Sequence, residues 1–247
     1  QFKGTFTFAR NKVLEYDEAP GLRPGMKTVG RRLNTFLGYV TNGLYENYTD
    51  VEESPTSTLG NIAISPGDIK YVDQPDANGN YDGRITSDDR VEIGDPWIPE
   101  IVYGFGPSMR WKNWDFSFFF QGQTNVSLIM ENFEPFGERS ARGVLAWIAD
   151  DYWSPDYPNV NAKHPRLTRL TNNHNMQVST YWLRDASFLK LKNVELGYSY
   201  KKARFYISGS NLLTISPFKH WDPEVGTGAG MQYPTQRIFN LGIQMSF

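Results

Sequence analysis

The chain has 247 residues, with 25 lysines and arginines against 27 aspartates and glutamates, a formal net charge of −2 and no cysteine. The near-neutral balance argues against a dedicated nucleic-acid binder, and the lack of cysteine excludes disulfide frameworks, thiolate metal sites and thiol nucleophiles. Aromatic residues make up 15% of the sequence although its mean hydropathy is −0.52. A chain that is polar on average yet rich in large rings suits a β-structure with girdles of aromatic side chains.

Residues 1–10 already alternate like a strand, and they lack both an initiating methionine and the charged-then-apolar pattern of a signal segment. We therefore expect the chain to be part of a longer protein. No run of the sequence approaches the roughly 18 apolar residues that a membrane helix requires. Any membrane crossing is expected to use strands.

Period-two alternation of apolar and polar residues recurs in segments of about 10 residues, which predicts strands. The clearest case is the last segment, where Phe239, Leu241 and Ile243 alternate with Asn240 and Gly242. In chain order the sequence predicts strands at residues 3–10, 33–42, 101–111, 114–124, 186–200, 203–213 and 235–247. The one helical stretch that the sequence suggests lies around residues 142–151.

The connections between these strands are either very short or very long. Lys112-Asn113 and Lys201-Lys202 suit two-residue hairpin turns, whereas three connections are rich in Asn, Asp, Pro and Gly: residues 43–100, 125–185 and 214–234. This pattern is typical of a membrane β-barrel with short periplasmic turns and long extracellular loops. It leaves residues 11–32 as a periplasmic connection, which is longer than such turns usually are.

Alternation alone fits either a soluble sandwich with one face in its core or a barrel wall with one face in lipid. Trp111 and Trp114, on either side of one turn, favour the barrel because aromatic girdles lie at membrane interfaces. Seven strands cannot close a barrel, so we predict an all-β fold that is part of a large antiparallel transmembrane β-barrel. The side chains expected to point into its lumen are Asp115, Gln121, Glu195 and Gln244. The alternative is a secreted soluble β-sandwich that binds or cleaves glycans.

Several blocks of the sequence resemble the SusC/RagA family of TonB-dependent outer-membrane transporters of Bacteroidetes. The blocks are PGDIKYVD at residues 66–73, DGRI at 82–85, DRVEIGDP at 89–96, WLRDASFLKLKNV at 182–194 and SGSNLL at 208–213. They follow one another in the family order and span nearly the whole chain. In this respect the chain looks like the C-terminal third of the family's barrel.

The resemblance implies a barrel of about 22 strands with a plugged lumen, to which residues 1–247 contribute about seven strands. It implies import of glycans or oligopeptides across the outer membrane of a Gram-negative bacterium, and no enzymatic activity. The implied partners are a SusD-like surface lipoprotein, the rest of the barrel and its plug, the TonB complex and membrane lipid. Phe247 resembles the terminal signal by which the barrel-assembly machinery recognises its clients.

The sharpest site candidate is the stretch NGNYDGRITSDD at residues 78–89. Aligned on Gly83, it follows the spacing of an EF-hand-like calcium loop, D-x-[DN]-x-[DN]-G with an acid at position 12. The expected calcium ligands are the side chains of Asn78, Asn80, Asp82 and Asp89 and the carbonyl of Arg84. Because Asn78 replaces an aspartate and Asp89 is shorter than the usual glutamate, weak affinity is expected. Residues that could substitute for one ligand are Asp73, Asp76 and Asp88, and the alternative is a metal-free turn held by Asx hydrogen bonds.

Support for catalysis is slight. The histidines are scattered in the long loops without the spacing of a metalloprotease or hydrolase motif: His164, His174 and His220. Acidic residues that could be paired for glycoside cleavage are more simply solvated: Asp150, Asp151, Glu131, Glu134 and Glu138. Loop tryptophans could stack on sugars, or could pack against another loop or the lipoprotein: Trp147, Trp153 and Trp221.

Overall fold

The computed structural model describes residues 1–131, 136–137, 140–141, 143–230 and 232–246. The chain divides into two compact units. The sheet unit consists of residues 1–11, 95–128 and 184–247, and the loop unit consists of residues 12–94 and 129–183. The loop unit is therefore built from chain that is inserted between parts of the sheet unit. Within the described ranges, no helix combines the length and the apolar character needed to cross a membrane.

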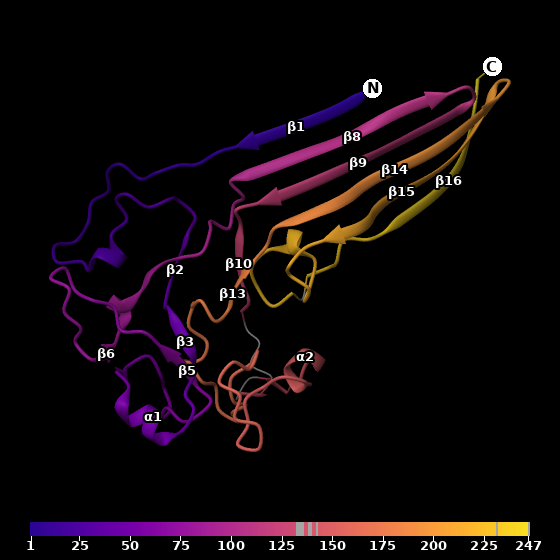
Figure 1. Cartoon of the computed structure of the whole chain (residues 1–247). Helices are drawn as coiled ribbons and strands as arrows, with labels where there is room; N and C mark the ends of the chain where they lie inside the picture. The colour runs from indigo at the N-terminus through magenta and orange to yellow at the C-terminus, as the bar shows by residue number, and fades with distance from the viewer. Residues whose placement is uncertain (132–135, 138–139, 142, 231, 247) are drawn as a thin grey trace. The chain divides into compact units, whose positions relative to one another are not determined.

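The sheet unit contains a six-stranded sheet in which the strands follow one another in chain order (Figure 1). They are β1 (Phe2–Phe8), β8 (Ile101–Trp111), β9 (Trp114–Thr124), β14 (Phe188–Tyr200), β15 (Ala203–Ile215) and β16 (Ile238–Met245). Every neighbouring pair is antiparallel. Two-residue turns begin at Lys112 and Lys201, which both have a φ of 53°. A positive φ there lets a tight turn follow the twist of its strands, as the predicted hairpins require.

The strand predicted at residues 33–42 is not part of this sheet, and that prediction is wrong. β1 pairs directly with β8 along its whole length, so no position is left between them. The segment instead forms β2 (Phe36–Gly38) and β3 (Thr41–Leu44), which belong to two small sheets of the loop unit. A Cβ added at Gly38 would lie 2.6 Å from the carbonyl oxygen of Val178, because the two backbones pack closely there.

With residues 33–42 outside the sheet, all the long connections leave it from the same end. Residues 9–100 form one connection between β1 and β8, and residues 125–187 and 216–237 form the other two. The two-residue turns lie at the opposite end. Residues 11–32 therefore lie within the long connection of residues 9–100. They do not form a separate connection at the end of the sheet where the two-residue turns lie, as the sequence predicted.

The elements of the loop unit are short. They are η1 (Pro24–Met26), β2, β3, α1 (Tyr48–Glu53), β4 (Thr56–Ser57), β5 (Ile69–Tyr71), β6 (Arg84–Ile85), η2 (Ser87–Asp89), β7 (Val91–Ile93), β11 (Phe136–Gly137), β12 (Ser140–Ala141) and α2 (Ala146–Ala149). β2 pairs with β7, β3 with β5, β4 with β6, and β11 with β12. Elsewhere, β10 (Ser127–Ile129) pairs with β13 (Leu183–Asp185), and η3 (Pro223–Val225) follows β15. α2 falls where the sequence suggested a helix.

A buried carboxylate connects the two segments that make up the loop unit. Asp68 is 0% exposed, and its Oδ1 lies 2.7 Å from Nε of Arg166. The side-chain amides of Asn172 and Asn175 donate to the same oxygen at 3.0 and 2.9 Å. A buried charge is costly unless it is paired and hydrogen-bonded, and this arrangement supplies both. Asp68 comes from residues 12–94 and its partners come from residues 129–183, so this cluster ties the unit together.

Candidate functional site

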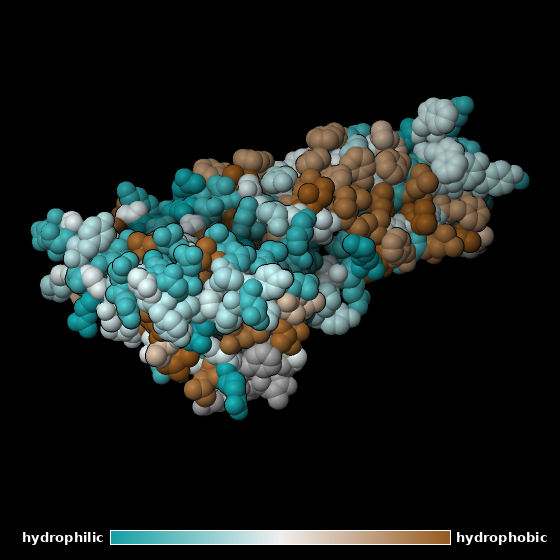
Figure 2. Space-filling view, turned by 60° about the horizontal axis from the view of Figure 1, so that its bottom comes forward, coloured by the Kyte–Doolittle hydropathy of each residue, from teal (hydrophilic) through white to brown (hydrophobic). Residues whose placement is uncertain are grey.

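The six-stranded sheet has one apolar face. Leu196, Ile207 and Leu241 lie side by side on β14, β15 and β16. Along each strand, the residues that precede and follow them point to the other face of the sheet. Further exposed apolar side chains of the same face are Phe2, Phe6, Phe105, Met109, Phe205, Phe239 and Ile243. Leu241 is 87% exposed, and Figure 2 shows hydrophobic residues gathered over the strands of the sheet unit. Such a continuous exposed apolar surface suits contact with lipid rather than with water.

The opposite face is polar and carries the residues that the sequence assigned to it. Its members include Asp115, Gln121, Glu195 and Gln244. Arg204 of β15 joins them, with its Nε 3.0 Å from Oδ1 of Asp115 and its Nη2 2.5 Å from Oε1 of Glu195. One guanidinium therefore bridges carboxylates on β9 and β14. Charge pairing of this kind makes the face suitable for a wet or protein-filled interior.

Aromatic and basic residues gather at the two hairpin turns of the sheet. Trp111 lies opposite Trp114 in the register of β8 and β9. The ammonium of Lys112 lies 4.9 Å from the ring centroid of Trp111, and that of Lys201 lies 5.4 Å from the ring centroid of Tyr200. Amphipathic rings and basic side chains of this kind are enriched where strands emerge from a bilayer.

A meander of antiparallel strands with one lipid-compatible face, one polar face and an aromatic girdle defines a segment of a membrane β-barrel wall. The fold is accordingly a partial all-β barrel. The outer strands of the described sheet are β1 and β16, and each has one edge that the other described strands leave unpaired.

TonB-dependent receptors are similar to the chain along most of its length. It is 28% identical to the TonB-dependent receptor P3 of Formosa agariphila, over 98% of this chain and 26% of that protein. It is 27% identical to the TonB-dependent receptor SusC of Bacteroides thetaiotaomicron, over 85% of this chain and 20% of that protein. No family model matches the chain.

Solved structures give the same picture at the level of the fold. The RagAB peptide transporter matches with a TM-score of 0.71 at 23% identity, over 100% of this chain and 27% of that chain. The RagAB peptide importer in its 'open-open' state matches with a TM-score of 0.68 at 20% identity, over 100% and 26% of the two chains. The chain is therefore SusC/RagA-like, as the sequence blocks predicted. It spans about a quarter of the length of the first curated relatives that it matches.

The residues of the predicted calcium loop are held by hydrogen bonds within the chain. Oδ1 of Asp76 accepts from the backbone N–H groups of Asn78 and Asn80 at 2.7 and 2.9 Å, and these bonds hold the pKa of Asp76 below its usual value. Asp82 accepts from the N–H of Arg84 at 2.9 Å. Among the described residues, no three His, Cys, Asp or Glu side chains are placed to hold a metal. Calcium binding by this loop stays a prediction.

A guanidinium from a distant segment lies among the carboxylates of this loop. Nη1 of Arg23 lies 2.7 Å from Oδ1 of the buried Asp89, and Nη2 lies 2.5 Å from Oδ2 of Asp82. Asp73 is 7% exposed, and its Oδ1, 3.9 Å from Arg23, is buried without a hydrogen bond. Burial and the carboxylates of Asp89 and Asp82 raise the pKa of Asp73. Arg23 supplies positive charge where the sequence predicted calcium, and no motif around it indicated this.

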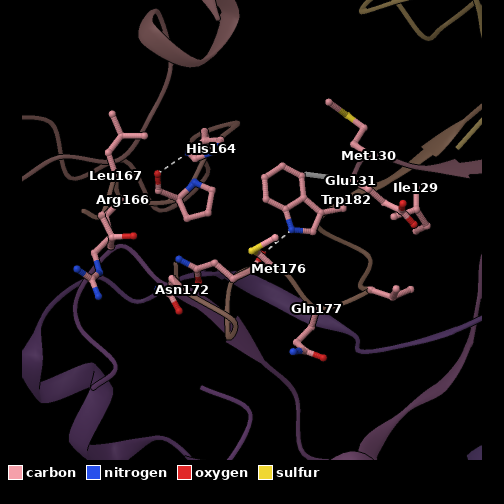
Figure 3. Close-up of a pocket in the computed structure, with 14 residues that line it drawn as sticks. Ile129, Met130, Glu131, His164, Arg166, Leu167, Asn172, Met176, Gln177 and Trp182 are labelled. Carbon is pink, nitrogen blue, oxygen red and sulfur yellow. Dashed lines mark hydrogen bonds between the residues drawn. The ribbon is translucent and has the colours of Figure 1, made fainter. Parts of the chain in front are cut away.

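The loop unit contains a pocket of about 160 Å³ (Figure 3). Its apolar lining includes Ile129, Met130, Met176 and Trp182, and its polar lining includes Glu131, Arg166, Asn172 and Gln177. The first two apolar residues and Trp182 are buried, whereas Met176 is 41% exposed and lies at the rim. The lining residues come from separate stretches of one long connection, so no local sequence pattern could have indicated the pocket.

The histidines are buried in or packed against the loops. His174 is almost fully buried, with Nδ1 3.1 Å from Oγ of Ser57 and Nε2 2.7 Å from the carbonyl oxygen of Ile69. Burial lowers the pKa of His174, so its ring is held as a neutral structural group. His164 is also buried, and the ring of His220 lies 5.5 Å from that of Phe218.

The loop tryptophans pack against their own surroundings. Trp153 is only 7% exposed, and a Cβ added at Gly67 would lie 2.3 Å from its ring, so this tryptophan packs loop against loop. The Trp221 ring centroid lies 4.5 Å from that of Phe218. Asp151 forms a surface ion pair with Lys163 at 3.5 Å. Three residues singled out by the sequence lie outside the described residues: Glu134, Glu138 and Phe247.

Proposed function

We propose that this chain forms part of the wall and of the extracellular mouth of a TonB-dependent transporter that imports nutrients across the outer membrane. The observation that carries the proposal is the six-stranded meander with one apolar and one polar face. The apolar face contacts lipid, and the polar face lines the lumen around the plug. The long connections leave the sheet from one end, which supports their placement on the extracellular side.

The similarity to TonB-dependent receptors also supports a proposal about the partners of this transporter. The remainder of the barrel pairs with β1 and β16, and the TonB complex supplies energy through other regions of the whole protein. A SusD-like lipoprotein covers the mouth. The relatives are named as receptors and transporters, which supports transport rather than catalysis. The location that this proposal gives to the protein is the outer membrane of a Gram-negative bacterium.

A charge placed at the middle of the apolar face tests this proposal. In the full-length protein, Leu241→Arg puts a cation into the lipid, which costs roughly 2–4 kcal/mol at the bilayer midplane. Its neighbour Asn240 lies on the polar face, so Asn240→Arg is the matched control. We expect loss of the heat-modifiable barrel from outer-membrane fractions for the first variant and normal assembly for the second. Normal assembly of both variants would contradict the face assignment.

Import itself is tested in cells that lack the full-length protein. Uptake of labelled glycans and of labelled oligopeptides is compared in the deletion strain and in the strain complemented with the wild-type gene. We expect uptake of at least one of the two classes to depend on the protein. Equal uptake of both classes in both strains would contradict the import function.

A further inference from the structure

We infer that the pocket of the loop unit binds one large apolar side chain of a peptide substrate. This inference rests on the proposed import function and assigns a substrate class to one site. The pocket lies entirely within the loop unit, and its lining residues are all described. Figure 3 shows Trp182 in the middle of this lining, with Met130 on one side and Met176 on the other.

The size of the pocket fits a single ring or a branched aliphatic group. Its volume is about 160 Å³. An apolar cavity of roughly 150 Å³ in another protein stays dry and takes up benzene, so this volume matches one aromatic side chain. The buried Ile129, Met130 and Trp182 supply apolar lining inside, and the exposed Met176 lies at the entrance.

Apart from Glu131, the polar side chains of the lining form hydrogen bonds within the protein. Arg166, Asn172 and Asn175 all hydrogen-bond to Asp68. The side-chain amide of Gln177 donates to the carbonyl oxygen of Asn173 at 2.8 Å, and the indole N–H of Trp182 donates to the carbonyl oxygen of Asn175 at 2.7 Å. A sugar ring presents hydroxyl groups on all sides, and burying them here without new partners would be costly. An apolar side chain has no such requirement.

The two methionines suit a site that accepts more than one side chain. Met130 and Met176 have flexible, polarizable thioethers, which adapt to different apolar shapes and interact well with aromatic rings. The exposed carboxylate of Glu131 also lines the pocket, where it can accept hydrogen bonds from the peptide main chain. The site therefore selects side chains by their size and polarity and accepts more than one residue type.

The test uses the full-length transporter, purified in detergent together with its lipoprotein. The probes are two blocked pentapeptides of alanine, one with phenylalanine at the centre and one with serine. Calorimetry should show about tenfold or tighter binding of the phenylalanine peptide, because only that peptide buries a ring. Met176→Asp puts a charge at the exposed entrance and should remove the preference, whereas Met176→Leu should keep it.

Three results would overturn the inference that the pocket binds a side chain of the substrate, and a fourth would overturn its substrate class. The three are equal affinity of the wild-type protein for both peptides, a preference that persists in Met176→Asp, and loss of the lipoprotein from the Met176→Asp complex, which would assign the pocket to that partner. A maltohexaose probe whose binding Met176→Asp abolishes would overturn the substrate class. The uptake assay separates these failures from failure of the transport function, because it compares strains with and without the whole protein.

Discussion

At the scale of single residues, Arg23 changes how the acidic loop is understood. The spacing of the sequence alone predicts a calcium ion bound by oxygens of residues 78–89. The structure places the guanidinium of Arg23 against Asp82 and Asp89, and beside the buried Asp73. Three carboxylates share one positive charge, so the cluster keeps excess negative charge. The same cluster can therefore attract calcium only in competition with an arginine of the chain itself.

Removal of that arginine should increase the affinity of the loop for calcium. In the full-length protein, we expect Arg23→Gln to bind calcium about tenfold or more tightly than the wild type, because it frees Asp82 and Asp89 from a fixed cation. Calcium should then stabilise this variant against heat, since a ligand of the folded state raises its free energy of unfolding. Arg84→Gln, at an exposed arginine of the same loop, is the control. Equal calcium affinity in the wild type and Arg23→Gln would disprove the competition.

At the scale of elements, a buried lysine fixes the connection between β15 and β16. Lys190 of β14 is fully buried, and its ammonium lies 2.6 Å from both carboxylate oxygens of Asp222 and 2.5 Å from Oε2 of Glu224. Glu224 also binds Lys192 at 2.7 Å. The residues around η3 are thus anchored to the wall strand by charge. Burial favours the neutral carboxyl groups, but the bonds from Lys190 prevail and lower the pKa of both.

The direction of these pKa shifts predicts that acid releases the connection. Groups with lowered pKa add stability that is fully present above their ordinary values, 3.8 for Asp222 and 4.5 for Glu224, and is lost as the pH falls below them. Proteolysis of residues 216–237 by pepsin should therefore accelerate as the pH is lowered through this range. Lys190→Gln should make cleavage fast at the upper end of the range as well, whereas Lys192→Gln should have a smaller effect. Cleavage independent of pH in the wild type would argue against the anchor.

Local patterns predicted the hairpins and failed where packing is not local. The strands of β8–β9 and β14–β15 were predictable because each pair alternates clearly and is joined by two residues. Residues 33–42 also alternate, but Tyr39 and Leu44 nearby are buried against distant segments of the loop unit. The face of each strand followed from the period of two, whereas the positions of Arg23 and of the pocket depend on contacts between residues far apart in sequence.

At the scale of the whole molecule, the sheet is incomplete by itself. The outer strands β1 and β16 leave unpaired edges among the described residues, and one face is apolar throughout. Unpaired backbone groups cost several kcal/mol each in lipid, and exposed apolar edges promote aggregation in water. We therefore expect residues 1–247, expressed alone, to aggregate without detergent.

Sedimentation of the expressed chain in detergent-free buffer measures this, with the full-length protein in detergent as the reference. The rival secreted β-sandwich makes the opposite prediction, because its apolar face would be covered by a second sheet. A monodisperse soluble monomer of 28.3 kDa would favour that rival and count against the barrel.

The division of the chain into two-residue turns and long insertions also sets an order of folding. Closing a hairpin across Lys112-Asn113 or Lys201-Lys202 costs little chain entropy, so β8–β9 and β14–β15 are the pairs that form first. β1 must find β8 across residues 9–100, and β9 must find β14 across residues 125–187. Both searches shorten once the inserted residues have collapsed around Asp68. The last strand pairs to gain protection in pulse-labelled amide exchange should accordingly be β1–β8 and β9–β14. The rate at which the inserted residues collapse would then limit the rate at which the sheet is completed.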